Sequence, residues 1–299
     1  MEYSIVNRKI VQNNLLSNSF AQKENYMKLS ILTINLNNKS GLEKTMQSVF
    51  EQDYQNFEFI IVDGGSNDGS YELIEKESNR INKWISEKDN GIYNAMNKAI
   101  KLAEGEYCFF LNSGDYFVNS EVLSTLFKNN IDTDIISGNV LKVRNTGKWN
   151  RVKSHEQVNL LNLMRHSLPH QGSLIKRSLF DSIGYYNEQY KIISDWEFFL
   201  KALILNQSTY KHVEVDISFF MLDGISSQRS STKLARKESE DCIERHFGYM
   251  KDDLIEYRYF YNSYIGIMYE QLKRKNTLFQ ITEKLCENLF FLKKRIYGK

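Results

Sequence analysis

The chain has 299 residues, of which 41% are hydrophobic and 25% are charged, a composition typical of a globular protein. Its net charge of +2 argues against a nucleic-acid-binding protein, which normally carries a basic excess on one face. The three cysteines are odd in number and far apart, which indicates a reducing compartment and no zinc site, and no apolar run approaches the roughly 18 residues of a membrane span.

Strand-like and helix-like patterns alternate through the first half of the chain. Residues 1–26 are rich in Asn and Gln and weakly periodic, so we expect an extension before a domain that begins at Met27. Apolar and β-branched runs predict strands at 28–36, 57–62, 81–86 and 107–111, with helices between them at 42–50, 71–77 and 92–103. Ser40 is the expected N-cap of the first helix, and Gly105 the expected residue that ends the third. This order implies right-handed crossovers and a mainly parallel sheet.

The second half of the chain is less regular. We expect strands at 135–143 and 213–221, and helices at 156–166, at 178–183, from 194 and from 233 onward. The domain organisation that we predict is an extension at 1–26, an α/β domain at 27–227 and a helical C-terminal region at 228–299.

Three strands of the first half end in loops that carry acids: Asp63 with Asp68, then Asp89, then Asp115. Because the carboxyl ends of parallel strands share one edge of a sheet, we expect these loops to converge on a nucleotide site. The Gly-rich loop at 63–69 is neither a Walker loop nor a dinucleotide fingerprint, since it lacks Gly-Lys-Ser/Thr and its glycines are in the wrong order. The alternative is three ordinary Asp/Gly turns.

Six segments occur in the order and spacing of one large family: SILTINLN, IIVDGGSNDGS, SEKDNGIYNAMNKAIKLAEGEY, FFLNSGDYF, HQGSLIKR and SDWEFFLK. From Lys28 to about Ser227 the chain therefore resembles glycosyltransferase family 2. The resemblance implies a GT-A fold, which is a Rossmann-like α/β sheet flanked by helices, followed here by a C-terminal helical extension. It also implies inverting transfer of a sugar from a nucleotide diphosphate sugar, with Mg²⁺ or Mn²⁺ as cofactor.

The resemblance also implies a set of residues that bind the nucleotide sugar. Thr33 and Asp63 stand where the family contacts the nucleobase, which favours a uridine or other pyrimidine donor. Asp68 and Asp89 lie in the acid-bearing loops that line the same site.

The turn at 112–115 replaces the family's Asp-x-Asp type motif. Asp115 matches its last acid, so the resemblance implies that Asp115 binds the metal ion and that Asn112 contacts the nucleotide sugar. Gly114 stands where many members have a second Asp, so only one acid is placed at the metal.

Asp195 matches the acid that begins a helix beside the acceptor and serves as general base. Inversion requires one carboxylate to take the proton of the acceptor hydroxyl as its oxygen attacks the anomeric carbon. Considered alone, Asp195 is also an ordinary first-turn acid, favoured by the helix dipole. The resemblance favours the base, although Ser194 stands where many members have Glu.

Three further residues are candidates on the acceptor or diphosphate side. Pro169 stiffens the backbone before His170 and Gln171, so that either side chain could be aimed at the diphosphate or at the acceptor. Trp196 is a candidate for stacking on an acceptor sugar ring. A structural role is the alternative for each of them.

The function that we predict is transfer of a sugar, from a UDP-sugar, to a hydroxyl of a glycan or lipid-linked acceptor in surface polysaccharide biosynthesis. The alternatives are a nucleotidyltransferase and an inactive module that binds nucleotide sugars. Residues 1–9 lack a signal-peptide core, so a cytoplasmic protein is expected. The basic, aromatic C-terminal region suits peripheral contact with the inner face of the cell membrane, or packing in a homodimer.

Overall fold

The computed structural model describes residues 29–128, 132–144, 146–221 and 231–274, together with Gln280 and Lys284. Met1–Ser239 and Glu240–Lys299 form two compact units. The predicted extension at 1–26 and the predicted boundary between 227 and 228 lie outside the described residues.

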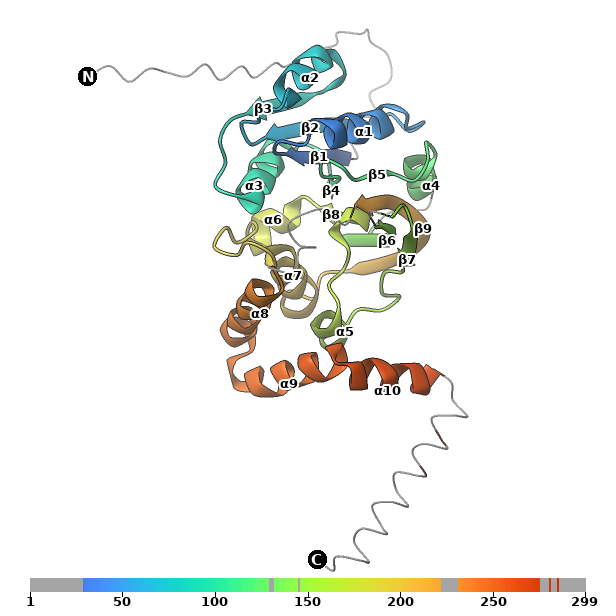
Figure 1. Cartoon of the computed structure of the whole chain (residues 1–299), viewed down its shortest axis with the longest axis vertical. Helices are drawn as coiled ribbons and strands as arrows, with labels where there is room; N and C mark the ends of the chain where they lie inside the picture. The colour runs from blue at the N-terminus through green and yellow to red at the C-terminus, as the bar shows by residue number, and fades with distance from the viewer. Residues whose placement is uncertain are drawn as a thin grey trace, which may run out of the picture. The chain divides into compact units, whose positions relative to one another are not determined.

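The first half of the first unit alternates strands and helices, as the sequence predicts (Figure 1). Its elements are β1 (Leu29–Asn35), α1 (Lys39–Phe50), β2 (Phe57–Asp63), α2 (Ser70–Lys76), η1 (Ser78–Arg80), β3 (Lys83–Ser86), α3 (Ile92–Leu102) and β4 (Tyr107–Phe110). The four strands are parallel in the order β3-β2-β1-β4, and Asn35 pairs directly with Asp63. All four therefore end at one edge of the sheet.

The second half extends the sheet in the order β4-β8-β6-β9-β5, with β7 paired to β6. Its elements are β5 (Tyr116–Phe117), α4 (Val122–Lys128), β6 (Ile135–Val143), β7 (Trp149–Val152), α5 (Leu160–Arg165), η2 (His170–Gly172), β8 (Ser173–Lys176), α6 (Ser178–Ile183), α7 (Ser194–Leu200), the π-helical turn η3 (Lys201–Leu205) and β9 (Tyr210–Met221). β8 pairs antiparallel with both β4 and β6, whereas β6 and β9 are parallel. Antiparallel pairs thus enter the sheet only in this half of the described chain.

Helices cover both faces of the parallel strands. Leu29 and Ile31 of β1 share a buried apolar core with residues of α1, α2 and α4, such as Leu42, Ile74 and Leu123. On the other face, α3 packs against β1 and β2. These strands appear in the sequence as continuous apolar runs, because a strand that is buried on both faces shows no alternation of apolar and polar residues.

Three predicted boundaries are wrong for local reasons. The N-cap of α1 is Asn38, whose side chain accepts from Gly41 N at 3.2 Å, and not Ser40. α3 ends at Leu102, so Gly105 is not the residue that ends it. A glycine is needed at position 105 because a Cβ there would lie 2.7 Å from the backbone of β1. α5 begins only at Leu160, after the Asn159 cap that bonds Asn162 N, so the helix predicted from 156 is shorter.

The C-terminal helices agree with the helical pattern of the sequence from 233 onward. α8 (Ser231–Phe247) runs across the division between the units, and η5 (Gly248–Met250), α9 (Lys251–Asn262) and α10 (Tyr264–Arg274) follow. α9 and α10 pack closely, since a Cβ at Gly266 would lie 2.1 Å from a backbone oxygen of α9. Among the helices that the structure describes, none is both long and apolar enough to cross a bilayer.

Candidate active site

A pocket of about 330 Å³ lies at the carboxyl ends of β1 and β4. Its walls are β1, the loops after β3 and β4, the start of α3, η2, the segment before α7 and the end of β9. Six of the residues predicted from the sequence line it: Asp89, Asn112, Asp115, His170, Gln171 and Asp195. The fold therefore brings together four separate segments at the edge where α/β sheets bind their ligands.

Asp115 is held at the pocket by a tightly bonded turn after β4. Its backbone N–H donates to Asn112 O at 2.9 Å, and its Oδ1 accepts from Met221 N at 3.0 Å. The Thr45 hydroxyl donates to Asp115 O at 2.6 Å and accepts from Gly114 N at 3.0 Å. Gly114 has φ +103°, a left-handed conformation that an Asp would adopt only with strain. This turn accounts for the single acid at the predicted metal position.

Three buried polar atoms of the pocket residues have no hydrogen-bond partner among the described residues: Asn35 Oδ1, Asn112 Oδ1 and His170 Nε2. Buried polar atoms are nearly always bonded in native proteins. Unpartnered atoms that gather at a pocket therefore indicate contacts with a ligand.

The Asn112 and Asp115 side chains fit a divalent cation. The unpartnered Asn112 Oδ1 and the Asp115 carboxylate are hard oxygen donors, which Mg²⁺ and Mn²⁺ prefer. Two protein ligands suffice when the remaining positions are taken by phosphate oxygens and water.

Asp195 lies in the first turn of α7, and both of its carboxylate oxygens have donors. Tyr93 OH lies 3.0 Å from Oδ1, and His170 Nδ1 lies 3.1 Å from Oδ2. Since an ionised carboxylate can only accept, His170 carries its proton on Nδ1, and Nε2 is left as the unpartnered atom at the pocket. Each carboxylate oxygen has two lone-pair sites, so Asp195 can still accept from a ligand hydroxyl.

Tyr93 is a site residue that the sequence did not reveal. Its hydroxyl also lies 2.7 Å from Ile192 O, so it ties α3 to the segment before α7. Burial, together with the nearby Asp195, raises the pKa of Tyr93 well above its usual value, which keeps the hydroxyl protonated as a donor. In the sequence Tyr93 reads as one more core residue of an amphipathic helix, and no local pattern distinguishes it.

Residues 30–195, from β1 to Asp195 itself, match the family model described as Glycosyl transferase family 2. The chain belongs to glycosyl transferase family 2. A PGL/p-HBAD biosynthesis glycosyltransferase of Mycobacterium bovis (strain BCG / Pasteur 1173P2) is 26% identical over 209 residues, which cover 66% of this chain and 78% of the relative. A putative teichuronic acid biosynthesis glycosyltransferase of Bacillus subtilis (strain 168), TuaG, is 37% identical over 90 residues, 29% of this chain and 36% of the relative.

Solved structures of two other proteins share this fold. S. aureus TarS 1–349 in complex with UDP-GlcNAc matches with a TM-score of 0.59 at 22% identity, over 85% of this chain and 78% of that chain. The Pyrobaculum calidifontis mannosyltransferase PcManGT, in complex with GDP-Man and Mn²⁺, matches with a TM-score of 0.53 at 14% identity, over 75% of this chain and 64% of that chain. The match to the longer TarS chain spans only 44% of it. These matches confirm the predicted GT-A fold.

Four of the residues predicted for this family 2 transferase do not line the pocket. Thr33 is buried and donates to Leu111 O at 2.7 Å, and Asp63 is buried beneath the loop that follows β2. Asp68 accepts from Lys39 N at 2.8 Å and from Ser70 N at 3.0 Å, which fixes the start of α2. Trp196 is buried and donates to Leu163 O at 2.7 Å. In this conformation all four bond to protein groups.

Lys191 is a second pocket residue that the sequence did not reveal, and it supplies a cationic side chain to the lining. The backbone N–H groups of Lys191 and Ile192 donate to the two oxygens of Glu238 at 2.8 and 3.0 Å. The segment before α7 is thereby fixed, and the ammonium group is available to an anionic part of a donor.

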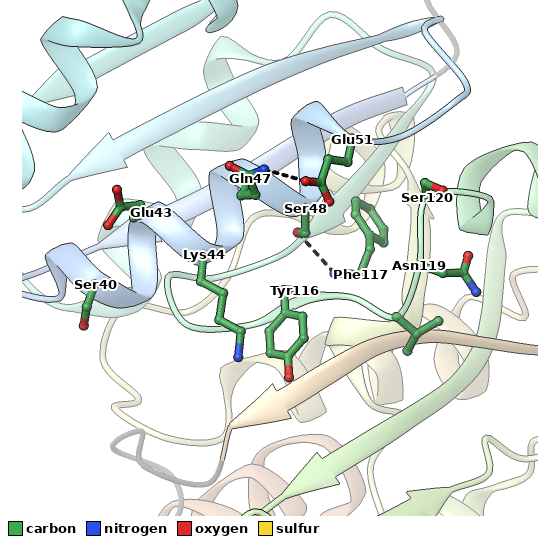
Figure 2. Close-up of a pocket in the computed structure, with 11 residues that line it drawn as sticks. Ser40, Glu43, Lys44, Gln47, Ser48, Glu51, Tyr116, Phe117, Asn119 and Ser120 are labelled. Atoms are coloured by element: carbon green, nitrogen blue, oxygen red, sulfur yellow. Dashed lines mark hydrogen bonds between the residues drawn. The ribbon is translucent and has the colours of Figure 1, made fainter.

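A second groove, of about 550 Å³, lies between α1 and β5 (Figure 2). Lys44 Nζ lies 3.7 Å from the centre of the Tyr116 ring, which also stacks on Phe219 with ring centres 4.8 Å apart. None of the predicted site residues lines this groove. We therefore assign the active site to the first pocket.

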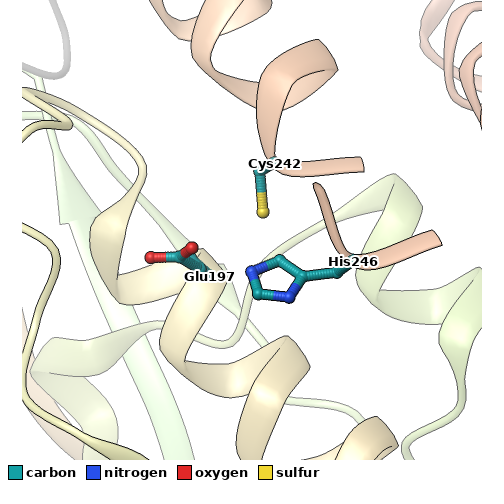
Figure 3. Close-up of side chains that lie close together, drawn as sticks. All are labelled: Glu197, Cys242 and His246. Atoms are coloured by element: carbon teal, nitrogen blue, oxygen red, sulfur yellow. The ribbon is translucent and has the colours of Figure 1, made fainter. Parts of the chain in front are cut away.

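Cys242 and His246 lie four residues apart and so project from one side of α8 (Figure 3). Cys108 and Cys242 are both buried, and neither forms a disulfide within the part of the chain that the structure describes. Burial raises the pKa of the Cys108 thiol well above its usual range, so this thiol is unreactive.

Proposed function

We propose that this glycosyltransferase transfers a sugar, with inversion, from a UDP-sugar to a hydroxyl of a glycan or lipid-linked acceptor in surface polysaccharide assembly. The observation that supports this best is that a single pocket is lined by Asp115 with Asn112 and by Asp195 with His170. The first pair suits the diphosphate and its cation, and the second suits an acceptor hydroxyl.

In the proposed reaction Asp195 takes the proton of the acceptor hydroxyl as that oxygen bonds to the anomeric carbon. The bond from the anomeric carbon to the donor phosphate breaks at the same time, and the nucleoside diphosphate leaves with the electron pair. A cation bound by Asp115 and Asn112 would stabilise the charge on the departing diphosphate as a Lewis acid. Tyr93 and His170 hold the Asp195 carboxylate in place, and Lys191 is available to the diphosphate.

The relatives support the donor and acceptor classes of this proposal. The TarS structure contains UDP-GlcNAc, and the PcManGT structure contains a sugar nucleotide with Mn²⁺. The Mycobacterium and Bacillus relatives are named for the biosynthesis of PGL/p-HBAD and of teichuronic acid. None of these four relatives is named as a nucleotidyltransferase.

The proposal is tested by release of nucleoside diphosphate from a panel of UDP-, GDP-, dTDP- and ADP-sugars, with and without a glycan or polyprenyl-phosphate-linked acceptor. We expect release from UDP-sugars, and a loss of at least hundredfold in Asp195→Asn and in Asp115→Asn. Asp181→Asn is the matched control, because this acid is 59% exposed on α6 and outside the pocket. Equal activity of Asp195→Asn and Asp181→Asn would exclude the proposed base, and inactivity towards every donor would favour a binding module.

We also propose that the C-terminal region contacts the inner, anionic face of the cell membrane. Tyr264 and Met268 of α10 are 93% and 55% exposed, and Ile265 and Ile267 beside them are exposed as well. From Tyr264 to Lys299 the sequence carries eight Lys and Arg against three Glu. Apolar side chains beside a basic excess suit an anionic lipid surface, where each basic residue adds roughly 1 kcal/mol.

Co-sedimentation with vesicles tests this membrane contact. We expect binding to phosphatidylglycerol vesicles that weakens with added salt, and a clear loss in Ile265→Gln/Met268→Gln. Leu161→Gln is the matched control, since Leu161 is an exposed leucine of α5 in the first unit. If the chain does not bind these vesicles but sediments as a dimer, and the double variant dissociates that dimer, α10 is instead a homodimer contact.

A further inference from the structure

The hairpin formed by β6 and β7 lies at the same edge of the sheet as the pocket. β4 is parallel to β1, and β8 is antiparallel to both β4 and β6, so β6 runs in the same direction as β1. The carboxyl end of β6 therefore lies at the edge where β1 and β4 end and where the pocket is found. The chain turns from β6 into β7 at this edge.

The end of the hairpin is also close to the pocket itself. Trp149 of β7 pairs in register with Val143 of β6, and Val143 pairs with Met221 of β9. Met221 lines the pocket, and its backbone N–H donates to Asp115 Oδ1. Trp149 is therefore two strand spacings, or about 10 Å, from a residue of the active site.

Backbone hydrogen bonds fix two cationic residues at the end of this hairpin. Arg144 N–H donates to Lys148 O at 2.9 Å, and Gly147 N–H, from a residue with φ +75°, donates to Arg144 O at 2.8 Å. The side chains of Arg144 and Lys148 are exposed, and neither forms an ion pair with a described residue. Residues 142–153 carry five basic residues and no acid, so this end of the hairpin is a local excess of positive charge.

The cations farther along β7 are neutralised by acids of β9. Arg151 lies 2.5 Å from Asp216 and 2.8 Å from Glu214, and Lys153 lies 3.1 Å from Glu214. The unpaired charge is thus confined to the end of the hairpin, beside Trp149, which is 57% exposed. Cations alone suit an edge strand because they prevent pairing with another sheet, but an exposed indole beside them does not serve that purpose.

We propose that Arg144, Lys148 and Trp149 bind an anionic lipid surface, so that the edge of the sheet that holds the pocket faces the headgroups of the bilayer. Indole rings are enriched at the membrane–water interface, and Lys and Arg near it are attracted to anionic headgroups. The inference rests on the proposed function, because a lipid-linked acceptor would be presented at that surface. It adds a contact in the first unit to the one proposed for α10.

Tryptophan fluorescence tests the inference directly. The chain has three tryptophans, and Trp84 and Trp196 are only 8% and 3% exposed, so Trp149 is the one whose surroundings a vesicle can change. We expect its emission to shift to shorter wavelength with phosphatidylglycerol vesicles but not with phosphatidylcholine vesicles, and Trp149→Phe to abolish the shift. If the chain sediments with phosphatidylglycerol vesicles while this emission stays unchanged, another surface binds them and the inference is wrong.

Arg144→Gln/Lys148→Gln tests the two cations. Removal of both should weaken binding to phosphatidylglycerol vesicles about thirtyfold. Lys76→Gln/Lys101→Gln is the matched control, because it removes the same charge from the last turns of α2 and α3. These helices connect parallel strands, so their last turns lie at the opposite edge of the sheet, and the control should bind within about twofold of the wild-type chain. An equal loss in both variants would show unspecific attraction and contradict the proposed surface.

Release of nucleoside diphosphate separates this inference from the proposed function. Arg144→Gln/Lys148→Gln should release it from the donor at the wild-type rate, because neither residue lines the pocket. A wild-type chain that transfers sugar but shows no change in Trp149 emission with vesicles overturns the inference alone. A chain that shows the change but acts on no donor overturns the proposed function and leaves the lipid contact standing. A shift that appears with rising protein concentration, without vesicles, would identify a second copy of the chain as the partner and overturn the inference.

Discussion

Tyr93→Phe tests whether the hydroxyl of Tyr93 positions the proposed base, Asp195. Phe keeps the ring that packs 5.6 Å from Tyr186 but removes the hydroxyl, whose one proton is shared between Asp195 Oδ1 at 3.0 Å and Ile192 O at 2.7 Å. A hydrogen bond to a charged group contributes about 1.5–3 kcal/mol, and about 1.4 kcal/mol is a factor of ten. We therefore expect kcat to fall about ten- to a hundredfold, with little change in KM for the donor.

The assay is steady-state release of nucleoside diphosphate, with donor binding measured separately by calorimetry. Tyr186→Phe is the matched control, because Tyr186 lies in the same aromatic cluster but donates no hydrogen bond to Asp195. A Tyr93→Phe enzyme with wild-type kcat, or one that loses donor binding in proportion to kcat, would refute the positioning role.

Three further predictions concern the metal and the buried tyrosines. EDTA should abolish transfer and Mg²⁺ or Mn²⁺ should restore it, whereas Asp115→Asn should stay inactive with the metal added back; full activity in EDTA would exclude a metal requirement. Tyr186→Phe should raise the free energy of unfolding by about 1 kcal/mol in urea, because it removes a buried hydroxyl without a partner; a destabilised variant would show that the hydroxyl is bonded. Burial raises the pKa of Tyr93, Tyr107 and Tyr186 above the usual value of 10.0. Above pH 10 the unfolded chain therefore releases protons that the folded chain keeps, so the contribution of these tyrosines to the free energy of unfolding is complete below pH 10 and is lost as the pH rises. Urea titrations from pH 8 to 11 should show this fall, and constant stability across that range would contradict it.

The parallel half of the sheet could be predicted from the sequence because its signals are local. Each strand is a short apolar run, and each helix has apolar spacing that a single window reveals. The sequence also indicated that Asp89 and Asp115 line one pocket, since both acids lie in loops that follow parallel strands. The two-residue strand β5 and the exposed four-residue strand β7 have no such pattern and were missed.

The hydrogen-bond partners within the site could not be predicted, because they depend on residues far apart in the chain. Asp63 accepts from Ser86, 23 residues away, and Asp195 is held by Tyr93, 102 residues away. The position of Asp63 in the family motif predicts a base contact, whereas the motif does not reveal the hydrogen bonds that its carboxylate accepts within the protein. Trp196 was equally ambiguous, since burial and stacking on a sugar both suit an indole until the bond to Leu163 O is seen.

The central claim is that this pocket performs inverting sugar transfer with Asp195 as the base. Water can replace the acceptor, so proton NMR of the sugar first released from an α-linked UDP-sugar tests the claim without knowledge of the natural acceptor. The account predicts that the β-anomer forms first and that Asp195→Asn abolishes its formation. First release of the α-anomer by the wild-type chain would contradict it.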